Sequence, residues 1–231
     1  MQMKRRDFTA TLLAGGAAAL ALPSAYGLNL SETDAIAGVR AALERGATVA
    51  VGLLGKPDGF LGNPKVRIPL PGYLEDAAKV LRTLGQQKRV DELVTAMNRA
   101  AEAAVPEAKT LLVSAVKSMS VQDATGILTG GDDSVTRFFA TKTRDPLGVK
   151  FLPIVTQATQ KVSLASKYNA IAGKVAGIGL VKQEDASIEQ YVTRKSLDGL
   201  YLMIGEEEKK IRQNPAAAGS AILQKVFGVL K

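Results

Sequence analysis

Two opposite charges near the end of the chain are the sharpest candidates for chemistry. Lys195 and Asp198 lie three residues apart in an apolar stretch, so a helix would place an ammonium and a carboxylate on neighbouring positions. Charges that enter an apolar region must pair or shift their pKa values. Tyr191, one turn before Lys195, is a third candidate. We expect a buried structural salt bridge here, and the alternative is a functional acid–base pair.

The string Gly130-Gly131-Asp132-Asp133 is the most site-like loop. Two glycines let the backbone turn freely, and the carboxylates of Asp132 and Asp133 are the kind of ligand that Ca²⁺ and Mg²⁺ prefer. The string lacks the alternating acidic order and the distal glutamate of an EF-hand loop. We therefore favour an acidic N-cap for the next helix, with a divalent-cation site as the alternative.

A third set of polar residues lies in an alanine-rich stretch. Asn98 and Glu102 are one helical turn apart, and Arg99 lies between them. The surrounding alanines indicate close neighbours on more than one side of this helix. We expect a structural hydrogen-bond network, with ligand binding as the alternative. The charged run 206–210 is instead expected to be a solvated helix surface.

Two residue types that carry much of enzyme chemistry are missing. The chain of 231 residues has no cysteine and no histidine. This excludes disulfides, thiol nucleophiles and a Ser-His-Asp triad, and it removes the usual zinc, copper and haem ligands. No cofactor is expected beyond the Ca²⁺ or Mg²⁺ alternative. No Gly-x-Ser-x-Gly motif occurs, so an enzyme would have to use carboxylates, lysine and tyrosine.

The first 27 residues have the pattern of a twin-arginine (Tat) signal peptide. Arg5-Arg6 directly precede Asp7-Phe8, and the apolar run that follows is too short and too rich in alanine and glycine to span a bilayer. Small residues around Ala25-Tyr26-Gly27 predict cleavage near Gly27. The pattern predicts export of a folded protein to the periplasm, leaving one domain over residues 28–231.

The overall charge limits the kinds of partner. The full chain carries a net charge of +8, and loss of the predicted signal removes two of these charges. The remaining basic residues are spread along the chain without a long run of one sign. We expect no nucleic-acid partner, whereas peripheral contact with anionic lipid is compatible with this charge.

The apolar pattern predicts an all-α, single-domain bundle of about eight to ten helices. Apolar residues recur at three- and four-residue steps, strand signals are almost absent and no repeat is found. Asp145-Pro146 is expected to break one helix, so that separate helices cover 151–164 and 168–181. A last long helix is expected to begin at Glu184 or Asp185, and a terminal helix after Pro215.

One long segment rich in proline and glycine, about residues 55–72, interrupts this pattern. Four prolines and two interior glycines forbid a continuous helix there. The stretch 66–70 is expected to be a short, strand-like extended piece. Phe60 and Leu61 are its predicted anchors, and with Ile68 they are expected to cover or line a groove between helices.

Several motifs, in order along the chain, resemble those of one family of exported bacterial proteins. They are Asp58-Gly59-Phe60, Val66-Arg67-Ile68-Pro69-Leu70-Pro71, Met97-Asn98-Arg99-Ala100-Ala101-Glu102, Gly130-Gly131-Asp132-Asp133, Tyr191-Val192-Thr193, Leu197-Asp198-Gly199-Leu200, Glu207-Glu208-Lys209-Lys210-Ile211-Arg212 and Lys225-Val226-Phe227-Gly228. The family is the domain of unknown function 4197 (DUF4197). The resemblance implies an envelope-side protein without an established activity. Arg67, within the second motif, is a further candidate for a ligand or network role.

These observations favour a non-enzymatic periplasmic protein that binds an envelope partner or an apolar ligand. The competing hypothesis is an enzyme based on carboxylates and lysine or on a divalent cation. It requires Asp132, Asp133, Glu102, Lys195, Asp198 and Arg99 to converge in one pocket.

Overall fold

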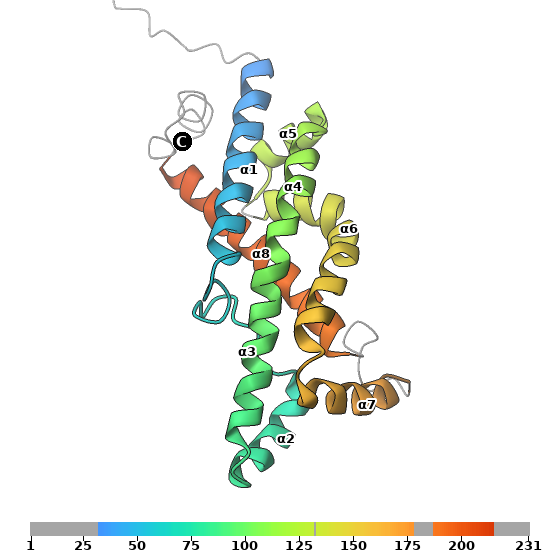
Figure 1. Ribbon diagram of the computed structural model, residues 1–231. Coiled ribbons are helices and arrows are strands. Elements are labelled where there is room, and N and C mark those ends of the chain that lie inside the picture. The colour runs from blue at the N-terminus through green and yellow to red at the C-terminus, as the bar shows by residue number, and fades with distance from the viewer. Residues whose placement is uncertain (1–31, 132, 178–186, 215–231) are drawn as a thin grey trace, which may run out of the picture.

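The computed structural model describes residues 32–131, 133–177 and 187–214, and these residues contain helices and no β-strand (Figure 1). The elements are α1 (Glu32–Leu54), α2 (Gly72–Thr83), α3 (Gln87–Ala104), the 3₁₀ turn η1 (Val105–Glu107), α4 (Ala108–Lys117), α5 (Val121–Thr129), α6 (Ser134–Thr159), α7 (Ser163–Gly177) and α8 (Ile188–Gln213). The prediction of an all-α, single-domain bundle is confirmed. The signal, Asp132, the expected helix start at Glu184 or Asp185 and the expected helix after Pro215 lie outside the described residues.

The core lies between α1, α3, α6 and α8. Helix α6 packs along α8 and α3, and α1 packs along α8 and α4. Helices α3 and α4 follow each other almost along one line, joined by η1 (Figure 1). Ala100, Ala101 and Ala104 of α3 are fully buried, and their small side chains let neighbouring helices approach closely. This explains the alanine-rich pattern of that stretch.

Helix α6 corrects the expected break at Asp145-Pro146. It runs from Ser134 to Thr159 with Pro146 and Pro153 inside it. Leu147, Phe151 and Val155 recur at four-residue steps and are fully buried, so one apolar stripe continues past both prolines. An interior proline costs about 3 kcal/mol, and burial of this stripe offsets that cost. The chain turns instead between Thr159 and Ser163, where α7 begins.

The two ends of the bundle carry different helices. Figure 1 shows the α2–α3 hairpin and α7 at one end, with α5 at the other. Helix α5 begins with a Ser120–Asp123 capping box, in which each side chain accepts a hydrogen bond from the other residue's backbone N–H. The bond from the Ser120 N–H is the main reason why the pKa of Asp123 is lowered. No helix in the described ranges is long and apolar enough to cross a membrane.

Residues 56–71 connect α1 to α2 without regular secondary structure apart from turns. The expected strand-like piece at 66–70 is not a β-strand, and Val66 lies in a turn. Phe60 and Ile68 are buried in the hydrophobic core, which agrees with the anchoring role expected of Phe60. This segment is held by polar side chains of α3 and α8.

Candidate functional site

Asn98 is a fully buried side chain of α3 that pairs with the backbone of Ile68. Its Oδ1 accepts a hydrogen bond from the Ile68 N–H at 2.8 Å, and its Nδ2 donates to the Ile68 carbonyl at 2.9 Å. The same Nδ2 donates to the Val94 carbonyl at 2.8 Å. A side-chain amide thus satisfies the backbone groups that a neighbouring strand would otherwise satisfy. This accounts for the absence of a β-strand at 66–70.

Glu102 holds the other end of the same segment. Its Oε1 accepts hydrogen bonds from the N–H groups of Phe60 and Leu61 at 3.0 and 3.1 Å. Its Oε2 accepts from Arg99 at 2.6 Å, and Arg99 also donates to Asp58 at 2.8 Å. These two carboxylates raise the pKa of Arg99, and the hydrogen bond to Glu102 has the larger effect.

Tyr191 of α8 completes this arrangement from the opposite side, because its hydroxyl donates to the Pro69 carbonyl at 3.1 Å. We call Asp58, Asn98, Arg99, Glu102 and Tyr191 the polar network. Its members connect residues 58–69 to α3 and α8, so Asn98, Arg99, Glu102 and Tyr191 form ties within the protein. The expectation of a structural network at Asn98 and Glu102 therefore agrees with the observed bonds.

The buried salt bridge expected between Lys195 and Asp198 is not what the structure shows. The Asp198 carboxylate accepts from Arg144 of α6 at 2.9 Å and from Arg194 at 3.4 Å, and its side chain is 41% exposed. The Lys195 ammonium lies 6.0 Å from the centre of the Tyr191 ring. The Arg144 guanidinium also lies over the ring of Tyr201. Tyr201 is buried, and this burial raises the pKa of its hydroxyl. No sequence pattern indicated that α6 would supply the cation.

The remaining candidates lie on the surface. Arg67 is exposed, and within the described residues its guanidinium makes no hydrogen bond or ion pair. Asp133 precedes α6 and lies 3.2 Å from Arg137, but its side chain makes no capping bond. The described residues contain no group of three or more acidic side chains placed to hold a metal ion. Since Asp132 is outside these residues, the cation alternative stays a prediction.

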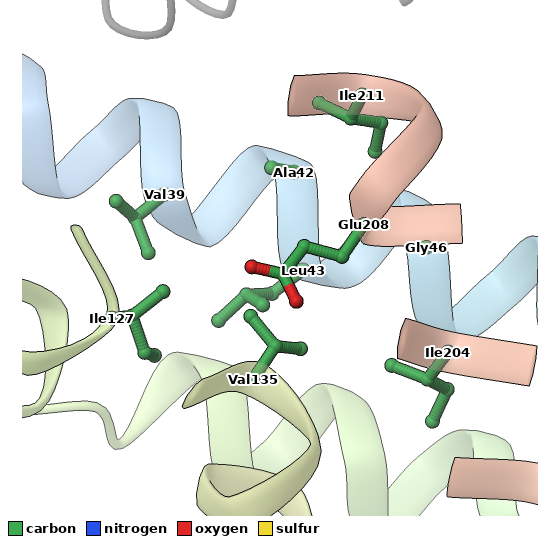
Figure 2. A pocket seen from close by; sticks show the side chains of 9 residues that line it. All are labelled: Val39, Ala42, Leu43, Gly46, Ile127, Val135, Ile204, Glu208 and Ile211. Carbon is green, nitrogen blue, oxygen red and sulfur yellow. The ribbon is translucent and has the colours of Figure 1, made fainter. Parts of the chain in front are cut away.

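Glu208 corrects the expectation that 206–210 is simply a solvated surface. Figure 2 shows its carboxylate among apolar side chains of α1, α5 and α6, including Val39, Leu43 and Val135. Glu208 accepts from Arg212 at 2.6 Å, and Arg212 donates to the Ile127 carbonyl at 2.7 Å. The cavity beside it measures about 10 Å³, the space of one water, so it is no ligand site.

A larger apolar groove lies between α2, α3 and α7. Its volume is about 410 Å³, within the range of about 300–1,000 Å³ that is usual for small-molecule sites. Its lining residues are almost all apolar: Leu70, Leu74, Ala78, Val80, Leu81, Val90, Leu93, Leu164 and Tyr168, with Arg89 and Lys167 as the charged exceptions. We call this the α2–α3–α7 groove. It is the best candidate for a binding site.

The two cations of the groove have no carboxylate partner among the described residues. Arg89 donates only long hydrogen bonds, to Gln86 at 3.3 Å and to Ser163 at 3.4 Å, and both acceptors are neutral. Lys167 is exposed and makes no ion pair there. Among the side chains that the structure describes, none of those lining the groove is acidic. The site therefore combines apolar walls with positive charge that an anion can neutralise.

The polar network and the groove are connected through the 56–71 segment. Leu70 lies between Pro69, which Tyr191 holds, and α2, and it forms part of the groove wall. Phe60, Leu61 and Ile68, which were expected to line a groove, do not line this one. The sequence did not single out Leu70, Arg89 or Lys167. Asp58 was also missed as a network member, although an aspartate with a positive φ of 64° fits a turn before Gly59.

Together, the fold and this site define an all-α domain with an apolar, cation-edged groove at one end. The chain belongs to the family described as "Protein of unknown function (DUF4197)", whose model matches residues 29–228. No curated protein and no solved structure matches the chain.

Proposed function

We propose that this protein binds an amphipathic ligand, one with an apolar chain and an anionic head group, in the α2–α3–α7 groove. One observation carries the proposal: the groove walls are apolar, and the charged residues among its described lining are Arg89 and Lys167. Each buried methylene contributes about 0.8 kcal/mol, so a chain of ten or more carbons supplies enough free energy to offset the cost of association. The two cations then select the head group.

We further propose that the protein acts in the periplasm as a non-enzymatic binding protein. The twin arginines and the apolar run after them support export, and the absence of cysteine and histidine supports a role without thiol, histidine-relay or soft-metal chemistry. The polar network also favours binding over catalysis, because Asn98, Arg99 and Glu102 use their polar atoms to hold the 56–71 segment.

The test compares two probes of equal chain length, dodecanoate and dodecanol, by isothermal titration calorimetry with the purified protein. A charge-assisted contact is worth about 1.5–3 kcal/mol, so we expect dodecanoate to bind roughly ten to a hundred times more tightly. Combined Arg89→Ala and Lys167→Ala replacement should abolish this preference and leave dodecanol binding unchanged. Native mass spectrometry of the purified protein should also show a co-purified amphipathic molecule.

The matched control is Lys109→Ala, which removes an exposed cation from α4 and should keep the preference. Leu164→Trp should weaken both probes, because the larger ring fills the groove. Equal affinity of the native protein for acid and alcohol would contradict a role of the cations. Failure of both probes to bind would contradict the groove as a site.

A further inference from the structure

The turn between α2 and α3 presents apolar side chains to solvent. Leu84, directly after α2, is 68% exposed, and Val80, one turn earlier, is 59% exposed. Positions four residues apart lie on the same side of a helix, so these two side chains form one small apolar surface. Gly85 closes the turn with a φ of +73°, which glycine adopts without strain.

The same turn is basic. Residues 77–90 carry Lys79, Arg82, Lys88 and Arg89 and no acidic residue, and the acidic pairs 75–76 and 91–92 flank this stretch in the sequence. Arg82 has one distant partner, Glu75, at 3.7 Å. We call residues 79–89 the hairpin tip. Exposed apolar side chains surrounded by cations are the combination that binds anionic lipid surfaces: the cations are attracted to the head groups, and the apolar side chains enter the interface.

The hairpin tip has a suitable position for such contact. It forms one extreme of the molecule, with α5 at the opposite end (Figure 1). Val80 and Arg89 belong to both the hairpin tip and the α2–α3–α7 groove, so the groove lies directly beside it. A tip that projects from the bundle can touch a bilayer without other helices intervening.

We propose that the hairpin tip docks on an anionic bilayer surface, with Leu84 and Val80 in the head-group region. The groove, if it has the proposed function, takes its amphipathic ligand from that bilayer, with the head group entering last, past Arg89. Positive charge on the tip complements the surface, whereas the charges of the 206–210 run on α8 are of mixed sign.

The experiment is co-sedimentation of the full chain with vesicles of phosphatidylcholine alone and of phosphatidylcholine containing 30% phosphatidylglycerol. We expect at least tenfold stronger binding to the anionic vesicles, and weaker binding as salt rises. Leu84→Glu and Lys88→Glu should each lower this binding at least fivefold. Neither residue lines the groove, and a glutamate at 88 lies in the first turn of α3, where the helix dipole favours it, so folding should persist.

The controls carry the same changes at other positions. Val121→Glu introduces the same charge at an exposed apolar residue of α5, and Lys109→Glu reverses an exposed cation of α4. Both should bind anionic vesicles like the native chain. Equal binding of the two vesicle types, unchanged binding of Leu84→Glu, or formation of dimers that Leu84→Glu abolishes would each overturn membrane docking.

The two proposals fail separately. Dodecanoate binding in vesicle-free solution tests the groove alone, and vesicle binding tests the hairpin tip alone. If both hold, Leu84→Glu should slow transfer of a fluorescent fatty acid from vesicles to the protein at least fivefold without changing its affinity in solution. Unchanged transfer would overturn delivery from the bilayer and leave the groove in place.

Discussion

Asn98 shows how one buried side chain can determine the path of a loop. Removing its amide leaves the N–H and the carbonyl of Ile68 buried without partners, and each such group costs about 1–3 kcal/mol. We therefore expect Asn98→Ala to lower the free energy of unfolding by about 2–4 kcal/mol, measured by urea denaturation.

Thr95→Ala is the control for this change, because Thr95 is exposed on the same helix and its loss should cost less than about 0.5 kcal/mol. A similar stability for Asn98→Ala and Thr95→Ala would show that the 56–71 segment is held by its apolar contacts alone.

The residue types of this network were readable in the sequence, but their partners were not. A polar pair one turn apart in an alanine-rich helix indicated buried hydrogen bonds at Asn98 and Glu102. Their acceptors and donors lie 30 and 42 positions away, in a segment whose turns no periodic pattern describes. Lys195 and Asp198 show the converse, because closeness in sequence suggested a pair while Arg144, 54 positions away, supplies the stronger bond.

Gly199 of α8 lets the 56–71 segment lie close against this helix, because glycine has no side chain. A Cβ at Gly199 would lie 2.8 Å from a ring carbon of Phe60 and 3.2 Å from the Cβ of Val66. The first distance is closer than carbon atoms pack and the second is tighter than most such contacts, so the absence of a side chain at position 199 lets the 56–71 segment lie this close to α8.

Gly199→Ala should therefore destabilise the protein by about 1–3 kcal/mol, because overpacking outweighs the gain in helix propensity. Gly148→Ala is the matched change within α6, where a Cβ meets nothing within 4 Å. It should stabilise the protein by about 0.5–1 kcal/mol. Thermal unfolding of both variants measures the two signs, and a stabilising Gly199→Ala would disprove the close contact.

At the scale of elements, local patterns predicted the helices well and their interruptions less well. The apolar stripes of α1 and α3 follow the three- and four-residue recurrence of the sequence, because such stripes depend on neighbouring residues. The expected break in α6 was wrong because the penalty of Pro146 is local, whereas the burial that offsets it comes from contacts with α3 and α8. A groove between helices was expected beside Phe60, Leu61 and Ile68, but the α2–α3–α7 groove was not predicted, since it exists only where these three helices meet.

The whole molecule is held by ties between distant parts of the chain. Tyr191 and Pro69 are 122 positions apart, and Arg212 and Ile127 are 85 apart. Such contacts form only when the complete domain has folded. Such a chain would suit the export proposed above, because the twin-arginine route carries folded proteins.

The export proposal therefore makes a prediction about the paired arginines. Combined Arg5→Lys and Arg6→Lys replacement keeps the charge of the n-region but removes the twin-arginine pattern. We expect the uncleaved precursor to accumulate in the cytoplasm, while the native sequence yields a shorter periplasmic form, both measured by cell fractionation and intact mass. Lys4→Arg, which leaves the pair in place, should be exported normally. The route also requires folding, so Asn98→Ala should reduce export in proportion to its unfolded fraction. Normal export of the double-lysine variant would show that the chain leaves by a route that does not read the pair.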